Sequence, residues 1–294
     1  MTLTDKLFHN STTTAEAGVG TDLSDEQQLH LTLHDGKRIP QLGLGVWQTP
    51  ADETADIVRH AVKAGYQSID TAMIYRNEEG VGAGLEGHPD IYVTTKLWND
   101  DQGYDATKRA FEASLRKLKR DVLDLYLMHW PQPKRGLYVE SWKAMIDLQR
   151  EGRIRSIGVS NFTADHLTRI IDETGVVPVV NQVELHPRFQ QRELCAFHEK
   201  HDIRTESWSP LGQGQVLNDP IITSIAGKHG KTAAQVVIRW HLDSGLIVIP
   251  KSATPKRIDE NIDVFDFRLD DEDMGKIAAM DTSGGRIGPD PATF

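Results

Sequence analysis

The sequence predicts an α/β protein built as a closed (β/α)8 TIM barrel, with an N-terminal β-hairpin and an extra C-terminal helix and tail. Two observations predict this fold. From about residue 41 onward, short β-branched runs alternate with amphipathic stretches, and strict alternation of strand and helix is typical of a parallel sheet. The alternation runs through eight units, which favours a barrel over an open doubly wound sheet, and about 250 residues suffice for such a barrel.

The elements are predicted in order along the chain. Residues 29–41 alternate apolar and polar side chains around Asp35-Gly36, a pair that favours a hairpin turn. The barrel strands are expected at 42–46, 67–71, 91–96, 122–128, 154–159, 178–184, 203–208 and 246–250. The helices are expected at 51–64, 77–86, 104–118, 139–151, 163–174, 190–200, 232–243 and 256–262. Residues 270–280 add a helix outside the repeat, and residues 284–294 form a tail expected over one end of the barrel.

Composition and charge narrow the class of protein. Residues 1–28 are rich in Thr, Asp, Glu and small residues, and we interpret them as a flexible N-terminal extension of a single barrel domain at 29–294. The lone cysteine, Cys195, excludes an intramolecular disulfide and a cysteine-based metal site, and no bound metal is expected. The net charge of −10 argues against a nucleic-acid partner.

No apolar run is long enough for a signal-peptide core or for a membrane-spanning helix. We therefore expect a cytoplasmic protein without a membrane partner. A monomer that acts on a small molecule is the default expectation.

Four polar side chains stand at the ends of three consecutive predicted strands. Asp70 ends the first of these, Tyr75 lies in the loop that follows, Lys96 ends the next, and His129 follows the third. Because active sites of (β/α)8 barrels lie at the C-terminal ends of the strands, these groups are expected to share one rim. Lys96 can lower the pKa of Tyr75, Asp70 can hold Lys96 charged, and His129 can donate a hydrogen bond to a substrate oxygen. Such a set suits protonation of an oxygen that becomes an alkoxide when a hydride adds to a carbonyl.

Each of these residues also has a purely structural interpretation. Asp70 and Lys96 could form an ion pair at the rim, Tyr75 could anchor a loop, and His129 could be a satisfied residue at a strand end. We prefer the functional interpretation because all four fall on the same rim in consecutive units.

The motifs around these residues resemble those of the aldo-keto reductases. Asp70-Thr-Ala-x-x-Tyr75, Thr95-Lys96 and His129-Trp-Pro match the family's pattern. Further matches follow in order over residues 30–282: Gly43-Leu-Gly45, Gly158-Val-Ser160-Asn161, Asn181-Gln182, Trp208-Ser-Pro-Leu211-Gly212, Ile249-Pro-Lys251-Ser252, and Arg257 with Glu260-Asn261. Within the family, Asn181-Gln-x-Glu184-Leu-His-Pro is similar to the bacterial 2,5-diketo-D-gluconate reductase group.

This resemblance implies NADPH-dependent reduction of an aldehyde or ketone, such as a keto-sugar acid or a 2-oxoaldehyde. Tyr75 would be the general acid, tuned by Lys96 and Asp70, and His129 would orient the carbonyl. Ser160, Asn161 and Gln182 would hold the nicotinamide carboxamide, and Trp208 would stack on the ring. The other implied cofactor contacts are Leu211, Gly212 and Gln213 along the pyrophosphate, Lys251, Ser252 and Arg257 at the 2′-phosphate, Glu260 and Asn261 at the adenine end, and Gly45, Val46, Trp47 and Ser209.

The positions of two further groups of residues indicate roles for them. Trp47, Trp98 and Trp130 follow predicted strands and are expected to form, with His129, the walls of the substrate pocket, although they could simply fill the barrel mouth. His198 and His201 are interpreted as part of a solvated helix face, not as metal ligands.

Two other functions remain open at this point. A redox-sensing module would bind NADPH with little turnover. A barrel lyase would use Lys96 as a Schiff-base amine, but this needs a lysine of lowered pKa, and Asp70 should keep Lys96 protonated.

Overall fold

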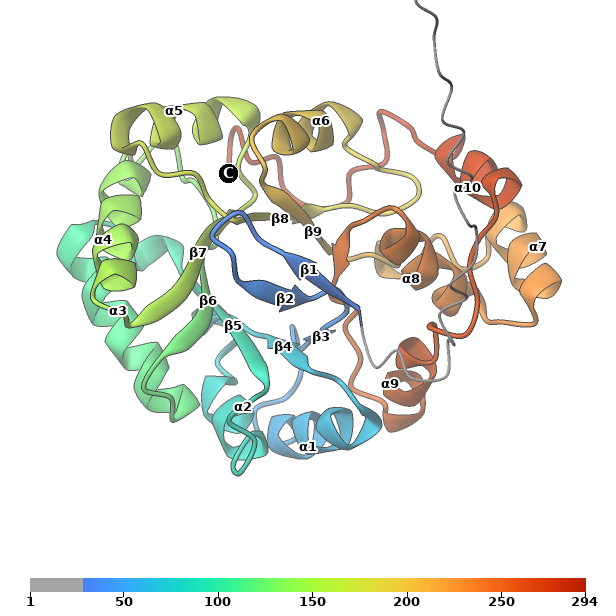
Figure 1. Ribbon diagram of the computed structural model, residues 1–294, viewed down its shortest axis with the longest axis horizontal. Coiled ribbons are helices and arrows are strands. Elements are labelled where there is room, and N and C mark those ends of the chain that lie inside the picture. The colour runs from blue at the N-terminus through green and yellow to red at the C-terminus, as the bar shows by residue number, and fades with distance from the viewer. Residues whose placement is uncertain (1–28) are drawn as a thin grey trace, which may run out of the picture.

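The computed structural model describes residues 29–294, so the extension predicted at 1–28 lies outside the described residues. Eight parallel strands form one sheet in chain order. Backbone hydrogen bonds between the segment before the first barrel strand and the last strand close the sheet. The N–H of Gly43 donates to the carbonyl of Val248 at 3.0 Å, and the N–H of Val248 donates to the carbonyl of Gln41 at 2.9 Å. The predicted closed barrel is confirmed (Figure 1). Its strands are β3 (Leu44–Gly45), β4 (Ser68–Asp70), β5 (Tyr92–Leu97), β6 (Leu123–Met128), β7 (Ile154–Ser160), β8 (Val180–Glu184), β9 (Arg204–Trp208) and β10 (Ile247–Val248).

Helices surround the strands (Figure 1). In the helix Tyr104–Leu118 the buried residues include the predicted stripe of Ala110, Phe111, Ser114, Leu115 and Leu118. Within residues 29–294, no helix is both long and apolar enough to span a membrane. The helices are α1 (Thr54–Ala64), α2 (Glu78–Gly84), α3 (Tyr104–Leu118), α4 (Tyr138–Arg150), α5 (Ala164–Thr174), α6 (Arg192–Lys200), α7 (Pro220–His229), α8 (Ala233–Asp243), α9 (Pro255–Ile262) and α10 (Asp271–Ala278).

Alternate residues of each strand point to opposite faces, so each strand presents one set of side chains to the helices and the other set to the barrel interior. The ring of Tyr126 on β6 packs outward against Phe111 of α3, with ring centroids 5.2 Å apart. Thr95 on β5 also points outward and donates a hydrogen bond to Glu78 of α2 at 2.6 Å. Its neighbour Lys96 therefore points into the barrel.

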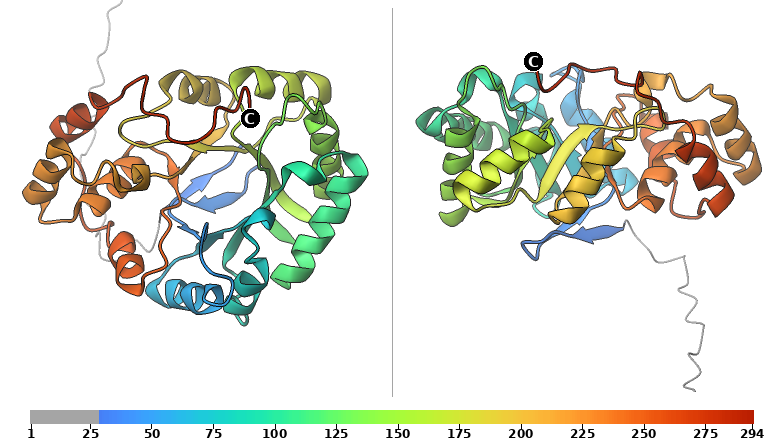
Figure 2. Two further views of the ribbon diagram at one scale, coloured as in Figure 1. Left: turned by 180° about the vertical axis from the view of Figure 1, so that it is seen from behind. Right: turned by 90° about the horizontal axis from the view of Figure 1, so that it is seen from above.

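The N-terminal hairpin closes one end of the barrel. Its strands β1 (His30–Thr32) and β2 (Arg38–Pro40) pair antiparallel, as predicted. Leu33 and Ile39 of the hairpin pack against Leu125 and Leu127 of β6. The C-terminal tail lies on the opposite side of the barrel, so the mouth is left to the tail and the loops that follow the strands (Figure 2, right).

Helix α7 was missing from the sequence prediction, which left residues 209–231 without a helix. The signals for its ends are nonetheless local. Pro220 occupies the first turn, the Asp219 side chain accepts a hydrogen bond from the N–H of Ile221 at 3.0 Å, and Gly230 ends the helix with a φ of 62°. The helix was overlooked because its residues 220–227 are nearly all apolar or small and show no clear polar face.

Candidate active site

The four groups predicted to share a rim lie on β4, on β5, directly after β6 and in the short 3₁₀ turn η1 (Met73–Tyr75). Asp70 is the last residue of β4, and Lys96 lies one residue before the end of β5. The Lys96 ammonium donates to Oδ1 of Asp70 at 2.5 Å and to the carbonyl oxygen of Thr71 at 2.8 Å. The Lys96 side chain is fully buried, so this ion pair is shielded from water.

The rings of Tyr75 and His129 lie beside this ion pair. Their centroids are 5.8 Å apart with an interplanar angle of 76°, an edge-to-face contact. The Lys96 ammonium lies 5.2 Å from the centroid of the Tyr75 ring. Trp98 also contacts His129 edge to face, with ring centroids 5.2 Å apart. The structure thus brings the acid, the amine, the phenol and the imidazole together at one mouth.

Burial and charge set the protonation states of these groups. Burial raises the pKa of Tyr75, and the ammonium of Lys96 offsets only part of that rise. A lowered pKa was predicted for Tyr75 from the sequence. Lys96 does act in that direction, but the loss of water around the phenol outweighs its effect. Burial alone would lower the pKa of Lys96, yet the charges of Asp70 and its other neighbours raise it. Lys96 is therefore a protonated amine and Tyr75 a neutral phenol.

His129 is held in its neutral form. Burial and the nearby charge of Lys96 lower the pKa of His129 well below 6.5. Its Nδ1 atom is buried and has no hydrogen-bond partner among the described residues. A neutral imidazole in this place can donate one hydrogen bond to an oxygen without adding a second positive charge beside Lys96.

The residues implied for the nicotinamide carboxamide meet at the ends of β7, β8 and β9. The indole N–H of Trp208 donates to Oδ1 of Asn161 at 2.8 Å, and Nδ2 of Asn161 donates to the backbone carbonyl of His129 at 3.0 Å. Gln182 donates through Nε2 to Oδ2 of Asp70 at 2.9 Å and to Oε2 of Glu206 at 3.1 Å. Both N–H groups of this amide are used, which leaves its carbonyl oxygen to accept a hydrogen bond from a ligand.

Ser160 and the loop after β9 complete this side of the mouth. The Ser160 hydroxyl donates to the backbone carbonyl of Gln182 at 2.8 Å. After β9, Ser209, Gly212 and Gln213 have φ values of 47°, 54° and 51°, a left-handed path that turns the chain sharply. Leu211 lies within this turn.

The residues implied for the phosphate end follow β10 and enter α9. Lys251 and Arg257 are exposed, and Ser252 is buried at the helix start. A phosphate there would meet two cations, a hydroxyl and a helix N-terminus, which is a suitable set of donors. Gly45 lies beside this segment, where an added Cβ would be 3.0 Å from the carbonyl oxygen of Ile249.

The remaining implied cofactor residues differ in their surroundings. The carboxylate of Glu260 accepts a hydrogen bond from the Thr232 hydroxyl at 2.8 Å, so it already links α9 to the start of α8. Asn261 is buried, as is Val46, whereas Trp47 is 43% exposed. Trp47 is therefore free to contact a ligand in the mouth.

The C-terminal tail crosses the mouth. It is held there by Glu184, for which no role was predicted from the sequence. The carboxylate of Glu184, at the end of β8, accepts from the backbone N–H of Ile287 at 2.6 Å and of Gly288 at 2.8 Å. At the end of the tail, the Phe294 ring packs on Trp130, with centroids 4.5 Å apart. The signal for Glu184 was available, because it is a charged residue closing an apolar strand at the C-terminal rim.

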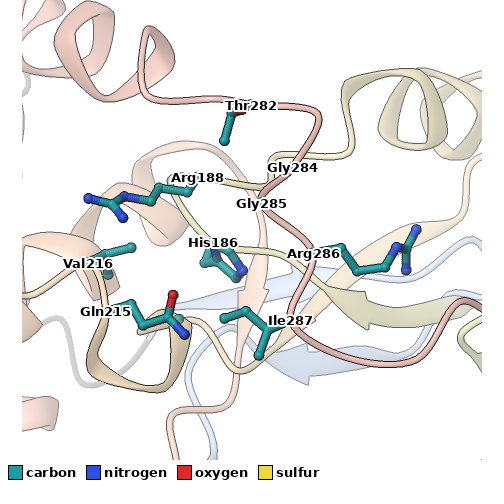
Figure 3. Close-up of a pocket in the computed structure, with 10 residues that line it drawn as sticks. His186, Arg188, Gln215, Val216, Thr282, Gly284, Gly285, Arg286 and Ile287 are labelled. Atoms are coloured by element: carbon teal, nitrogen blue, oxygen red, sulfur yellow. The ribbon is translucent and has the colours of Figure 1, made fainter.

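A small cavity of about 240 Å³ lies between the tail and the β8–α6 loop (Figure 3). His186 stands between the tail residues Gly285 and Ile287 and the side chain of Gln215. None of the four rim residues described above lines this cavity, although Gly212 of the loop after β9 does.

The interpretation of His198 as a solvated residue was wrong. His198 is 1% exposed. One ring nitrogen lies 2.9 Å from Nδ2 of Asn181 and the other lies 2.8 Å from the hydroxyl of Thr205. The ring therefore joins α6 to the outer faces of β8 and β9.

Known proteins share this fold and much of this sequence. The chain is 58% identical over 268 residues to an aldo-keto reductase of Mycolicibacterium smegmatis, an alignment that covers 90% of this chain and 97% of the relative. It is 56% identical over 270 residues to methylglyoxal reductase DkgA of Escherichia coli, with the same coverage. The crystal structure of a Gox0644 mutant in complex with NADPH matches it at 64% identity with a TM-score of 0.91, covering 92% of this chain and 99% of that chain.

The apo crystal structure of Gox0644 matches equally well, at 65% identity and a TM-score of 0.90, over 90% of this chain and 98% of that chain. The model of the Aldo/keto reductase family matches residues 41–282, which is nearly the whole barrel. The chain belongs to the aldo/keto reductase family.

Proposed function

We propose that this protein is an NADPH-dependent carbonyl reductase in which Tyr75 protonates the substrate oxygen. The observation that carries the proposal is the buried Lys96–Asp70 ion pair beside the Tyr75 ring, with His129 at the edge of that ring. A phenol that is neutral at physiological pH, next to a fixed ammonium, can release its proton to an alkoxide as negative charge develops.

NADPH, when bound, supplies the hydride for the carbonyl carbon. The chain's own residues act on the carbonyl oxygen. His129 donates a hydrogen bond that orients this oxygen toward the Tyr75 hydroxyl, and Tyr75 transfers its proton as the C–O double bond becomes a single bond. The ammonium of Lys96 then stabilises the tyrosinate, and Asp70 keeps that ammonium charged and in place.

The chain's remaining residues position the cofactor. Gln182 and Asn161 would orient the carboxamide, and Trp208 would present a flat face to the nicotinamide ring. Lys251 and Arg257 would recognise the 2′-phosphate that distinguishes NADPH from NADH.

We propose small 2-oxoaldehydes and keto-sugar acids as the substrate class. The relative from Escherichia coli is named a methylglyoxal reductase. In the present chain Trp98 packs on His129, and Trp130 packs on the tail residue Phe294, so these rings would form the walls of the substrate pocket. Aromatic walls around one polar rim suit a short carbonyl compound better than a long flexible one.

The lyase alternative is disfavoured by the charge on Lys96. A Schiff base forms only from an uncharged amine, whereas the pKa of Lys96 is raised by Asp70 despite burial. The redox-sensing alternative predicts negligible turnover, which the following experiment measures directly.

The test is the loss of NADPH absorbance with methylglyoxal, a keto-sugar acid and an aromatic aldehyde. Tyr75→Phe is expected to reduce kcat/KM at least about 100-fold and to leave the Kd for NADPH nearly unchanged, since the ring is kept and only the acid is removed. Tyr126→Phe is the matched control, because the Tyr126 hydroxyl is buried away from the mouth and has no hydrogen-bond partner within residues 29–294. Equal loss of turnover and NADPH binding in Tyr75→Phe would show that Tyr75 is structural.

A further inference from the structure

A second buried acid, Glu206, is joined to the rim through Gln182. Glu206 lies on β9 and is 2% exposed. Its Oε2 accepts a hydrogen bond from Nε2 of Gln182 at 3.1 Å, and the same nitrogen donates to Oδ2 of Asp70 at 2.9 Å. One amide group thus joins two carboxyl groups inside the barrel. The mechanism described above uses Asp70 but gives Glu206 no part.

Two carboxyl groups that share one donor in a buried place do not both ionise readily. Oδ1 of Asp70 lies 2.5 Å from the ammonium of Lys96, whereas no cation among residues 29–294 donates a hydrogen bond to Glu206. The negative charge therefore resides on Asp70, and the proton resides on Glu206. In agreement with this geometry, burial and the charge of Asp70 raise the pKa of Glu206 to about 8.

The titratable groups that face Glu206 lie on neighbouring elements. Asp70 of β4, Lys96 and Tyr92 of β5 and Tyr75 of η1 all interact electrostatically with it. Its backbone neighbours, Gln182 of β8 and Ile247 of β10, carry no charge. A negative charge on Glu206 opposes ionisation of Tyr75 and raises the pKa of that phenol.

We propose that Glu206 is a positioning residue for carbonyl reduction. This acid is coupled to Asp70 through Gln182, and the negative charge of Glu206 in alkaline solution keeps the Tyr75 phenol protonated. As the solution becomes alkaline, Glu206 loses its proton before Tyr75 does, because the pKa of Tyr75 is raised from 10.0. The resulting carboxylate then makes removal of the Tyr75 proton harder. Reduction is thereby extended to higher pH. This inference rests on the proposed role of Tyr75 as the acid.

Glu206→Gln tests the inference, since it keeps the shape and a hydrogen-bond acceptor but cannot ionise. At an effective dielectric constant of about 20, the loss of one negative charge inside the barrel changes the pKa of a neighbouring group by roughly one unit. The alkaline limb of kcat/KM for reduction should therefore move to lower pH by about one unit.

Two further readouts separate this effect from structural damage. At a fixed alkaline pH, Glu206→Gln should slow carbonyl reduction and speed alcohol oxidation, because oxidation needs the tyrosinate that the missing charge had opposed. In the protein without nucleotide, the near-ultraviolet absorbance of tyrosinate, corrected with Tyr75→Phe, should show Tyr75 ionising at lower pH. Structural damage would slow both directions of the reaction.

Glu78→Gln is the matched control. Glu78 is a buried acid that accepts a hydrogen bond from the Thr95 hydroxyl. Thr95 precedes Lys96 in sequence, but its side chain lies on the outer face of the sheet. Its pH profile should match that of the unaltered protein. If Glu206→Gln fails to fold, Glu206→Met removes the same charge and should produce the same shift.

The outcomes for the two proposals differ. Loss of reduction in Tyr75→Phe together with an unmoved alkaline limb in Glu206→Gln would overturn the inference about Glu206 alone. Full activity in Tyr75→Phe would instead overturn the proposed function. Equal slowing of reduction and oxidation in both Glu206 variants would show that Glu206 has only a structural role.

Discussion

Replacement of Lys96 by methionine is expected to destabilise the fold strongly, although methionine has nearly the same length. In the folded protein the side chains of Lys96 and Asp70 are 0% and 3% exposed and their charged atoms are 2.5 Å apart. The substitution leaves the Asp70 carboxylate buried, with the amide of Gln182 at 2.9 Å as its remaining side-chain donor. The carbonyl of Thr71 also loses its bond at 2.8 Å.

The expected size follows from this arrangement. Breaking a buried ion pair by removal of one partner costs about 3–5 kcal/mol, since the other charge stays in a place without water. Adding Asp70→Asn to Lys96→Met removes the isolated charge. The double variant should therefore regain about 2 kcal/mol or more of the free energy of unfolding, although it carries one more substitution.

The assay is urea denaturation, followed by tryptophan fluorescence and far-ultraviolet circular dichroism, on the two single variants and the double variant. Lys143→Met is the matched control, because Lys143 pairs with Glu140 on the surface with 43% and 49% of the side chains exposed. It should leave the unfolding midpoint unchanged. A loss below about 1 kcal/mol in Lys96→Met, or a double variant no more stable than Lys96→Met, would refute the reasoning.

Three other substitutions test other parts of the protein. Gly288→Ala would place a Cβ 2.5 Å from Cη2 of Trp208, so it should displace the tail or the indole. A fluorescence titration should then show NADPH binding several-fold weaker. Gly284→Ala is the control, because its added Cβ would have no heavy atom of the described residues within 4 Å and should leave NADPH binding unchanged. Arg257→Ala should raise the Kd for NADPH about tenfold or more and that for NADH little, and an unchanged ratio of the two constants would remove Arg257 from the phosphate site. Burial lowers the pKa of His198 from 6.5 to about 4. As the pH falls, His198 therefore binds a proton in the unfolded chain before it does so in the folded protein. The free energy of unfolding should fall by up to about 3 kcal/mol as the pH drops through this range. A His198→Gln variant with an equally steep acid limb in its unfolding free energy would contradict that assignment.

The barrel and its rim could be predicted from local features of the sequence. Strand and helix periodicity is set by neighbouring residues, and all strands of a parallel barrel point the same way. Polar residues that close consecutive strands, such as Asp70 and Lys96, must therefore lie at one end, whatever the details of packing. The grouping of these polar residues at one rim could therefore be predicted from the sequence.

Local patterns were insufficient where a residue's neighbour is remote in sequence. His198 sits on a helix whose sequence looks solvated, and only the packing of α6 on the barrel buries it beneath Asn181 and Thr205. The tail was predicted to lie over one end, but its anchor at Glu184 is 103 residues away from Ile287. Loops and tails carry no periodicity from which such contacts could be inferred.

The sequence by itself determined that eight strands alternate with helices and that an acid, an amine, a phenol and an imidazole occupy one rim. Only the tertiary structure decided how these groups are charged and which residues lie behind them. Gln182 is 112 residues from Asp70, and closure of the barrel brings its amide between Asp70 and Glu206. The net direction of the Tyr75 pKa likewise depends on how completely water is excluded, a quantity that is a property of the packed interior and not of any segment of the chain.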